Sequence, residues 1–283
     1  MKIHLITVVG GRVSTLGHML NYYLSMDLDS ILLYVHSTFL DDPLLIQISD
    51  IARSHGINVA GQIIGDWAEV QHRIFSQMAL ASENEWYLIA DQDEFQYYTE
   101  NVRTILQYCE TKKYSYLRGC FIDRFSADGL LPDVAPDLSL SDQFPIGSFF
   151  TLPVMGGHPM KVVAARGGVK LTNGGHHRTL NGVSCPPDQY FIQVHHYKWT
   201  KGLLEYLSER SSQLPDESAV KREDHRFTCY YQHNGNIIDL SDPGILAAPC
   251  STGYIYWETV RAICATVDLR QKINTLLKSS GSL

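Results

Sequence analysis

The chain has 283 residues, of which 45% are hydrophobic and 19% are charged. This length is enough for one large domain or two small ones with a substantial core. The chain carries 23 Lys and Arg against 30 Asp and Glu, a formal net charge of −7 with histidine neutral. A global acidic excess argues against a protein that coats nucleic acid or lies on anionic lipid, because both partners need a basic face. A small anionic ligand stays compatible, since one local cluster of cations can hold it.

The six cysteines are scattered and include no CxxC pair. This spacing is not that of a zinc framework or a dense disulfide scaffold, so we expect buried, reduced thiols. The apolar run over residues 3–9 is short for a signal peptide, and no other stretch has the length of a membrane span. We therefore expect a cytoplasmic protein without a transmembrane segment.

The first half alternates between strand and helix periodicities. Apolar, β-rich runs over residues 3–9, 31–36, 57–64 and 86–90 predict strands. Helical spacing of apolar residues separates them near 16–24, 45–52 and 74–79, and Gly56 follows the second helix as a C′ residue. This rhythm is typical of a parallel sheet with right-handed crossovers. We predict an α/β fold with a mainly parallel central sheet flanked by helices.

The second half is more mixed. A helix is expected over 102–109 and a strand over 114–122. Residues 128–159 are rich in Gly, Pro, Asp and Ser, which predicts a long functional loop. Later strands are expected at 162–165 and 190–196, a helix at 199–207, and helical spacing returns over 254–277.

The segment after the fourth predicted strand carries the most chemical information. An apolar strand ends in three carboxylates within four residues, in the string Asp91-Gln92-Asp93-Glu94. In open parallel sheets, ligands bind outside the carboxyl ends of the strands. Clustered acids repel one another, so a cation is the natural way to keep them ionised. If the chain stays extended, Asp91 and Asp93 point the same way and both reach one ion. The alternative is a structural turn in which Asp93 or Glu94 caps the next helix.

The string Asp91-Gln92-Asp93-Glu94-Phe95 resembles the DxDEF signature of family 2-like glycosyltransferases with a GT-A fold. The resemblance covers about the first 125 residues, including 3–12, 16–26 and the 66–73 segment. It returns loosely at 190–210, where His196-Tyr197 is similar to a late His-Tyr motif. It implies a nucleotide-sugar-binding half over 1–125. Residues 126–283 would then form the acceptor side and the C-terminal helices of the same domain.

The resemblance also implies roles for individual residues. Asp93 would be the direct ligand of Mn²⁺ or Mg²⁺, and Asp91 would contact the ribose or the metal through water. Glu94 would support the turn or the acceptor side. The positions expected near the base or the diphosphate of a UDP- or GDP-sugar are Thr7, Val8, Asp66 and Arg73. For Arg73, a solvated helix face is an equally good interpretation.

Histidine is abundant, with twelve in the chain and two adjacent pairs, His176-His177 and His195-His196. Neutral imidazole is a metal ligand, and neighbours on a strand point to opposite faces, so one of each pair can face a shared site. We favour His196, which occupies the position similar to the family motif, and keep His195 in reserve. The His176-His177 pair is better explained by ordinary hydrogen bonding.

Three basic residues are candidates for a leaving diphosphate. Lys198 and Lys201 lie within one helical turn of each other, although an exposed lysine at a helix start explains each of them slightly better. Arg12 follows Gly10-Gly11 and gives a weak version of the Gly-rich basic loop of nucleotidyltransferases.

An inverting sugar transfer also needs a general base for the acceptor hydroxyl. The candidates are Asp123, at the end of a predicted strand, and Asp188, which follows two prolines and also suits an ordinary turn. The leading hypothesis is a metal-dependent, inverting glycosyltransferase with a saccharide, lipid or protein acceptor. The alternatives are a nucleotidyltransferase that forms a nucleotide-sugar and a non-catalytic sugar- or nucleotide-binding protein of the same fold.

Overall fold

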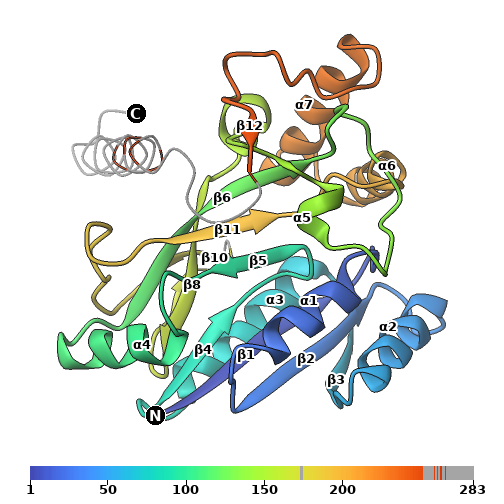
Figure 1. Cartoon of the computed structure of the whole chain (residues 1–283). Helices are drawn as coiled ribbons and strands as arrows, with labels where there is room; N and C mark the ends of the chain where they lie inside the picture. The colour runs from blue at the N-terminus through green and yellow to red at the C-terminus, as the bar shows by residue number, and fades with distance from the viewer. Residues whose placement is uncertain (173–174, 251–257, 259, 261, 263–264, 266–283) are drawn as a thin grey trace, which may run out of the picture.

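The structure, a computed structural model, describes residues 1–172, 175–250, 258, 260, 262 and 265 (Figure 1). The first half contains β1 (Lys2–Val9), α1 (Leu16–Leu24), β2 (Ser30–Ser37), α2 (Pro43–Ser54), β3 (Val59–Ile64), α3 (Trp67–Ser76), a short 3₁₀ turn (Gln77–Leu80), β4 (Glu85–Ile89), β5 (Glu94–Tyr97) and α4 (Val102–Thr111). Strands β1 to β4 are parallel and lie in the order β3-β2-β1-β4. The predicted α/β fold with a mainly parallel first half is confirmed.

The second half continues the same sheet. It contains β6 (Tyr116–Phe125), α5 (Leu140–Gln143), β7 (Ile146–Ser148), a π-helical turn (Thr151–Met155), β8 (Met160–Arg166), β9 (Leu171–Thr172), β10 (Gly175–Thr179), β11 (Ile192–His196), α6 (Leu203–Gln213), α7 (Ala219–His233) and β12 (Ala248–Pro249). Strand β8 joins β4 to β6 and is antiparallel to both. Strand β11 pairs in parallel with β6 and antiparallel with β5. The result is a mixed sheet.

Helices cover both faces of the parallel strands because those strands are apolar on both faces. On β1, Ile3 and Leu5 pack with α1, α2 and α4, whereas Ile6 and Val8 pack with α3 on the opposite face. A separate apolar cluster joins α6 and α7 to Phe125 and Trp199. In Figure 1, α1, α2 and α3 surround β1–β4, and α6 and α7 lie beyond β6 and β11.

The order in which successive strands are added to the sheet reverses between β1 and β4. From β1 the order runs outward through β2 to β3, and the next parallel strand, β4, then returns to the other side of β1. Such a switch point leaves a crevice outside the carboxyl ends of the two strands, where ligands of open α/β sheets bind. The residues after Val9 and after Ile89 therefore meet at this crevice.

Most predicted elements are present, with their ends shifted by a few residues. The predicted C′ residue Gly56 has a φ of 71°, in the left-handed region that favours glycine. Helix α3 begins earlier than expected, because the Asp66 carboxylate accepts a hydrogen bond from the Glu69 amide and starts the helix. The region predicted as a long loop holds α5, β7 and the π-helical turn. The helix expected over 254–277 lies almost entirely outside the described residues.

The described cysteines are free thiols: Cys109, Cys120, Cys185, Cys229 and Cys250. All but Cys229 are buried, in agreement with the expectation from their spacing. Among the described residues, no helix combines the length and the apolar character needed to cross a bilayer.

Candidate functional site

The acidic segment after β4 forms a tight turn. The Glu94 amide donates to the Asp91 carbonyl at 3.1 Å, and β5 begins at Glu94. The condition of an extended chain is therefore not met, and the two aspartates do not point the same way. Asp91 faces His176, with 3.9 Å between Oδ2 and Nε2, while Asp93 faces His196, with 3.8 Å between Oδ2 and Nε2. The turn presents two carboxylates to two different histidines.

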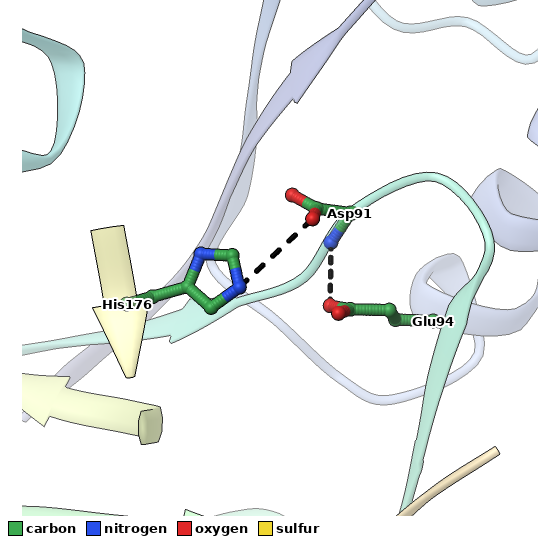
Figure 2. A group of neighbouring side chains, drawn as sticks. All are labelled: Asp91, Glu94 and His176. Carbon is green, nitrogen blue, oxygen red and sulfur yellow. Dashed lines mark hydrogen bonds and ion pairs between the residues drawn. The ribbon is translucent and has the colours of Figure 1, made fainter. Parts of the chain in front are cut away.

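Around Asp91 the turn is half-buried and held by a second carboxylate (Figure 2). Glu94 accepts a hydrogen bond from the Asp91 amide at 2.8 Å and forms a buried ion pair with Lys161 of β8. Burial, followed by the charge of Glu94, raises the pKa of Asp91 to about 7. Burial lowers the pKa of His176 well below its ordinary value, so this imidazole is neutral at neutral pH. The Glu94 carboxylate therefore connects the turn to β8.

His196 is aligned on Asp93 by a carboxylate behind it. Register places His196 beside Asp123 on β6, and its Nδ1–H donates to Asp123 Oδ1 at 3.0 Å. This bond leaves Nε2 directed toward Asp93, the arrangement in which a carboxylate fixes the tautomer of a metal-binding histidine. Burial alone would lower the pKa of His196, but the hydrogen bond to Asp123 and the charge of Asp93 outweigh it and raise the pKa.

Asp123 is completely buried and makes several hydrogen bonds. Besides His196, its carboxylate accepts bonds from the backbone amide of Thr151 at 2.8 Å and from Trp199 Nε1 at 3.1 Å. The Thr151 hydroxyl lies within hydrogen-bonding distance of both carboxylate oxygens. These donors occupy both oxygens and hold the carboxylate away from solvent.

A cavity of about 140 Å³ opens at the switch point. Its lining is Val8, Gly10, Arg12, Ser14, Thr15, Trp67, Asp91, Gln92, Asp93, His196, Tyr197, Lys198, Tyr206 and Arg210. Three cationic side chains, Arg12, Lys198 and Arg210, face two carboxylates here. Burial, followed by the charge of Arg210, lowers the pKa of Lys198. The excess of positive charge suits an anionic ligand, and the carboxylates suit a cation held with it.

The loop after β1 is tied to both sides of this cavity. The Arg12 guanidinium donates to the Lys198 carbonyl at 3.0 Å and bonds to Thr200, while the Gln92 amide bonds to the Arg12 carbonyl. Gly11 has a φ of 74°, and a Cβ there would lie 2.5 Å from the Tyr206 ring. Glycine is therefore needed for α6 to approach the loop this closely.

Arg210 reaches the cavity from α6 and is anchored from α7. Asp224, only 1% exposed, accepts a bond from Arg210 Nε at 3.0 Å and forms a second contact with the same guanidinium. The Ser211 hydroxyl donates to this carboxylate at 3.2 Å. A forked contact of this kind fixes the plane of the guanidinium. Arg210 is thus oriented before any ligand arrives.

A second cavity, of about 390 Å³, continues from the first. The two share Gly10, Trp67, Tyr206 and Arg210. The second cavity lies outside the ends of β1 and β2, between the N-terminus of α2 and helix α6. Trp67 and the partly exposed Phe39 contribute aromatic surface to it. Its size and aromatic lining suit a flat ring system.

The other candidates from the sequence are distributed differently. Val8 lines the first cavity, but the Thr7 hydroxyl is buried and has no hydrogen-bond partner in the part of the chain that the structure describes. Asp66 and Arg73 are exposed on α3 and at its start. Asp188 is exposed in the loop before β11, at the end of that strand opposite His196. The structure thus does not bring Arg73 or Asp188 to the cavity.

Of the remaining lysine and histidine candidates, one of each lines the first cavity and the other does not. Lys201 is exposed and pairs with Asp133 at 2.8 Å, away from the cavity lining that contains Lys198. His195 points to the face opposite His196, where its Nδ1 accepts a bond from Arg124 at 2.7 Å. Of that pair, only His196 lines the cavity.

Sequence reasoning did not find four residues of this region: Lys161, Tyr206, Arg210 and Asp224. For Lys161 a signal was available, because a single lysine inside the apolar run of β8 needs a buried partner. Arg210 and Asp224 lie on helices with many charged residues, where no pattern distinguishes them from solvated side chains. The apolar spacing of α7 is also too sparse to have predicted the helix.

We expect Asp91→Asn to stabilise the metal-free protein at neutral pH. The pKa of Asp91 is about 7 in the folded protein and about 4 in the unfolded chain. Ionisation of this carboxyl therefore lowers the free energy of unfolding as the pH rises from about 4 through about 7. With 28% of the side chain exposed, we expect a gain of about 2 kcal/mol at pH 8 and almost none near pH 4. Urea unfolding in EDTA at both pH values measures this. Equal stability of the variant and the wild type at pH 8 would contradict it, and Asp50→Asn is the matched surface control.

No family model matches the chain, and no curated protein matches its sequence. Solved structures with a similar arrangement include S. aureus TarS, at 11% identity and a TM-score of 0.38, over 86% of this chain and 44% of that chain. TarS 1–349 in complex with UDP-GlcNAc has 10% identity and a TM-score of 0.39, over 82% and 73% of the two chains. A 4-diphosphocytidyl-2C-methyl-D-erythritol synthase has 10% identity and a TM-score of 0.28, over 80% and 85%. The chain spans less than half of the full TarS chain. Similarity at this level establishes no family, so the function rests on the geometry of the site.

Proposed function

We propose that the chain is a metal-dependent glycosyltransferase that moves a sugar from a nucleotide-sugar to a hydroxyl acceptor. The observation that carries the proposal is the pairing of Asp93 with a histidine, His196, whose tautomer a buried carboxylate sets. This pair lies at the switch point of the sheet, in a cavity with three cationic side chains. Carboxylate and imidazole together with an anion-binding lining suit a cation held with a diphosphate.

The residues present fit a divalent ion. Asp93 and His196 face each other at 3.8 Å and are each partly exposed to the cavity, which leaves room for ligands from a substrate. When bound, Mn²⁺ or Mg²⁺ would neutralise charge on the leaving diphosphate. Asp93 and His196 would hold the ion, and Asp123 would orient His196. Asp123 is therefore proposed as a positioning residue and not as the base.

Protein cations would complete the anion site. Arg12, Lys198 and Arg210 approach the cavity from three different segments, after β1, after β11 and on α6. Fixed charges at the position where negative charge develops stabilise a transition state without reorganisation. The adjoining cavity, with Trp67 between the two, would take the nucleoside of the donor. With this division, the sugar would lie next to Asp91 and Asp93.

The deciding experiment is a panel of UDP-, GDP- and CMP-sugars with Mn²⁺ or Mg²⁺. We expect metal-dependent thermal stabilisation by one nucleotide class and hydrolysis or transfer of its sugar, because ligands that bind only the folded state raise its melting temperature. Release of pyrophosphate from a nucleoside triphosphate and a sugar phosphate would identify a nucleotidyltransferase instead. Tight binding that is independent of metal, without turnover, would identify a binding protein.

We expect Asp224→Asn to raise the KM for the donor about tenfold with a smaller change in kcat. The substitution removes the charge that orients Arg210, so the guanidinium is no longer held in the orientation that binds the donor. Ser211→Ala removes only one neutral hydrogen bond from the same carboxylate and is the matched control. Initial rates over a range of donor concentrations separate the two parameters. A fall in kcat at constant KM would rule out this positioning role.

A further inference from the structure

The turn after β4 contains a second set of potential metal ligands. Asp91, Glu94 and His176 each offer an atom that lies within 4.8 Å of those of the other two (Figure 2). The carboxylates come from the turn and the imidazole from β10. This set shares no residue with the pair formed by Asp93 and His196.

His176 has an unusual environment for a buried histidine. It is 5% exposed, and its Nδ1 atom is buried with no hydrogen-bond partner among the described residues. Its Nε2 points at Asp91, at 3.9 Å from Oδ2, which is too long for a hydrogen bond (Figure 2). The Asp91 Oδ1 atom is likewise buried without a partner. Buried polar atoms in proteins normally have partners, so two neighbouring side chains that each carry an unpaired buried atom indicate a missing ligand.

The charges around this set favour a cation. Asp91 and Glu94 bring two carboxylates together, and the ammonium group of Lys161 pairs with Glu94. Within the described residues Asp91 has no lysine or arginine ion-pair partner of its own, and the gap between Asp91 and His176 is the place where a cation would pair with it.

We propose that Asp91, Glu94 and His176 form a second divalent-cation site, separate from the donor site at Asp93 and His196. A mixture of carboxylate and imidazole ligands suits Mn²⁺ or another transition ion better than Mg²⁺, which prefers oxygen ligands and retains water. All three ligands belong to the protein, so this ion binds without nucleotide. It connects the turn to β10 and thereby sets the orientation of Asp91 beside the cavity.

The test counts Mn²⁺ ions bound to the EDTA-stripped full chain, from the loss of the free Mn²⁺ electron paramagnetic resonance signal. Without nucleotide we expect one ion per chain, lost in His176→Ala and retained in His196→Ala. His177→Ala is the matched control, because this neighbouring imidazole bonds to the Met160 carbonyl and lies outside the set. Adding UDP brings one further ion to the wild type, for a total of two, and one ion to His176→Ala, but adds none to His196→Ala.

The crossed design separates this site from the proposed function. If the wild type binds no Mn²⁺ until UDP is added, or if the nucleotide-free ion survives His176→Ala, the second site is overturned and the transferase proposal stands. If the nucleotide-free ion is present but UDP adds none, the donor-site assignment fails and the second site stands. Should His176→Ala not fold, Mn²⁺ must broaden the His176 ring resonance of the wild type without nucleotide. An unbroadened resonance overturns the site.

Discussion

Asp93→Asn is expected to reduce metal-dependent sugar transfer on the order of 10³-fold, because it removes the charged ligand directed at His196 and the cavity. The side chain is partly exposed and its closest charged partner is 3.8 Å away, so the free energy of unfolding should change by about 1 kcal/mol or less. Initial rates with the donor identified in the nucleotide-sugar panel, together with urea unfolding, measure the two effects separately.

The control for this substitution is Asp50→Asn. Asp50 is exposed on α2 and pairs with the neighbouring Arg53 at 2.7 Å, so the same chemical change there should leave transfer intact. If Asp93→Asn retains wild-type dependence on Mn²⁺ for nucleotide binding, the assignment of the ion to Asp93 is wrong. A loss of activity that parallels unfolding would also remove the support for a functional carboxylate.

Asp123→Asn is expected to damage both stability and metal affinity. In the wild type, the Thr151 amide donates to one carboxylate oxygen, and the Trp199 indole and the His196 imidazole donate to the other. Asparagine keeps one oxygen, so its NH2 group must oppose the donors on one side. Replacing one partner in a buried network costs about 3 kcal/mol. Because His196 loses the carboxylate that sets its tautomer, we expect the Mn²⁺ affinity at the donor site to be roughly 10- to 100-fold weaker.

This substitution also distinguishes a positioning residue from a base. If Asp123 were the general base, kcat would fall while Mn²⁺ affinity and stability stayed near their wild-type values. Asp188→Asn is the companion test, since the structure places this exposed carboxylate at the far end of β11. We expect it to leave the rate unchanged, and a large fall in kcat would restore it as the base.

Much of the fold could be predicted because it depends on short stretches of sequence. Strands β1 to β4 are continuous apolar runs, and helices α1, α2 and α4 carry apolar residues at helical spacing with polar residues between them. Helix α7 was not predicted, because its 15 residues bury only Asp224, Phe227 and Tyr231. The β5 strand was missed for a different reason, since a turn of two residues hides the start of a four-residue strand.

Some residues of the candidate site could also be predicted from the sequence, whereas others could not. Asp93 could be found from its place after an apolar strand, and His196 from its resemblance to a family motif. Arg210 could not, because a guanidinium on a polar helix looks solvated until Asp224 on the next helix orients it. His176 was interpreted as an ordinary hydrogen-bonded histidine, and only the position of β10 beside the turn shows that it faces Asp91.

By itself, the sequence determined the alternation of strands and helices and the position of the acidic turn at the carboxyl end of β4. Both depend on local periodicity and on where an apolar run stops. The tertiary structure alone decided that Asp91 and Asp93 face different histidines and that Asp123 lies behind His196. These contacts join segments far apart in the chain, and strand order and register, which no short window of sequence encodes, bring them together.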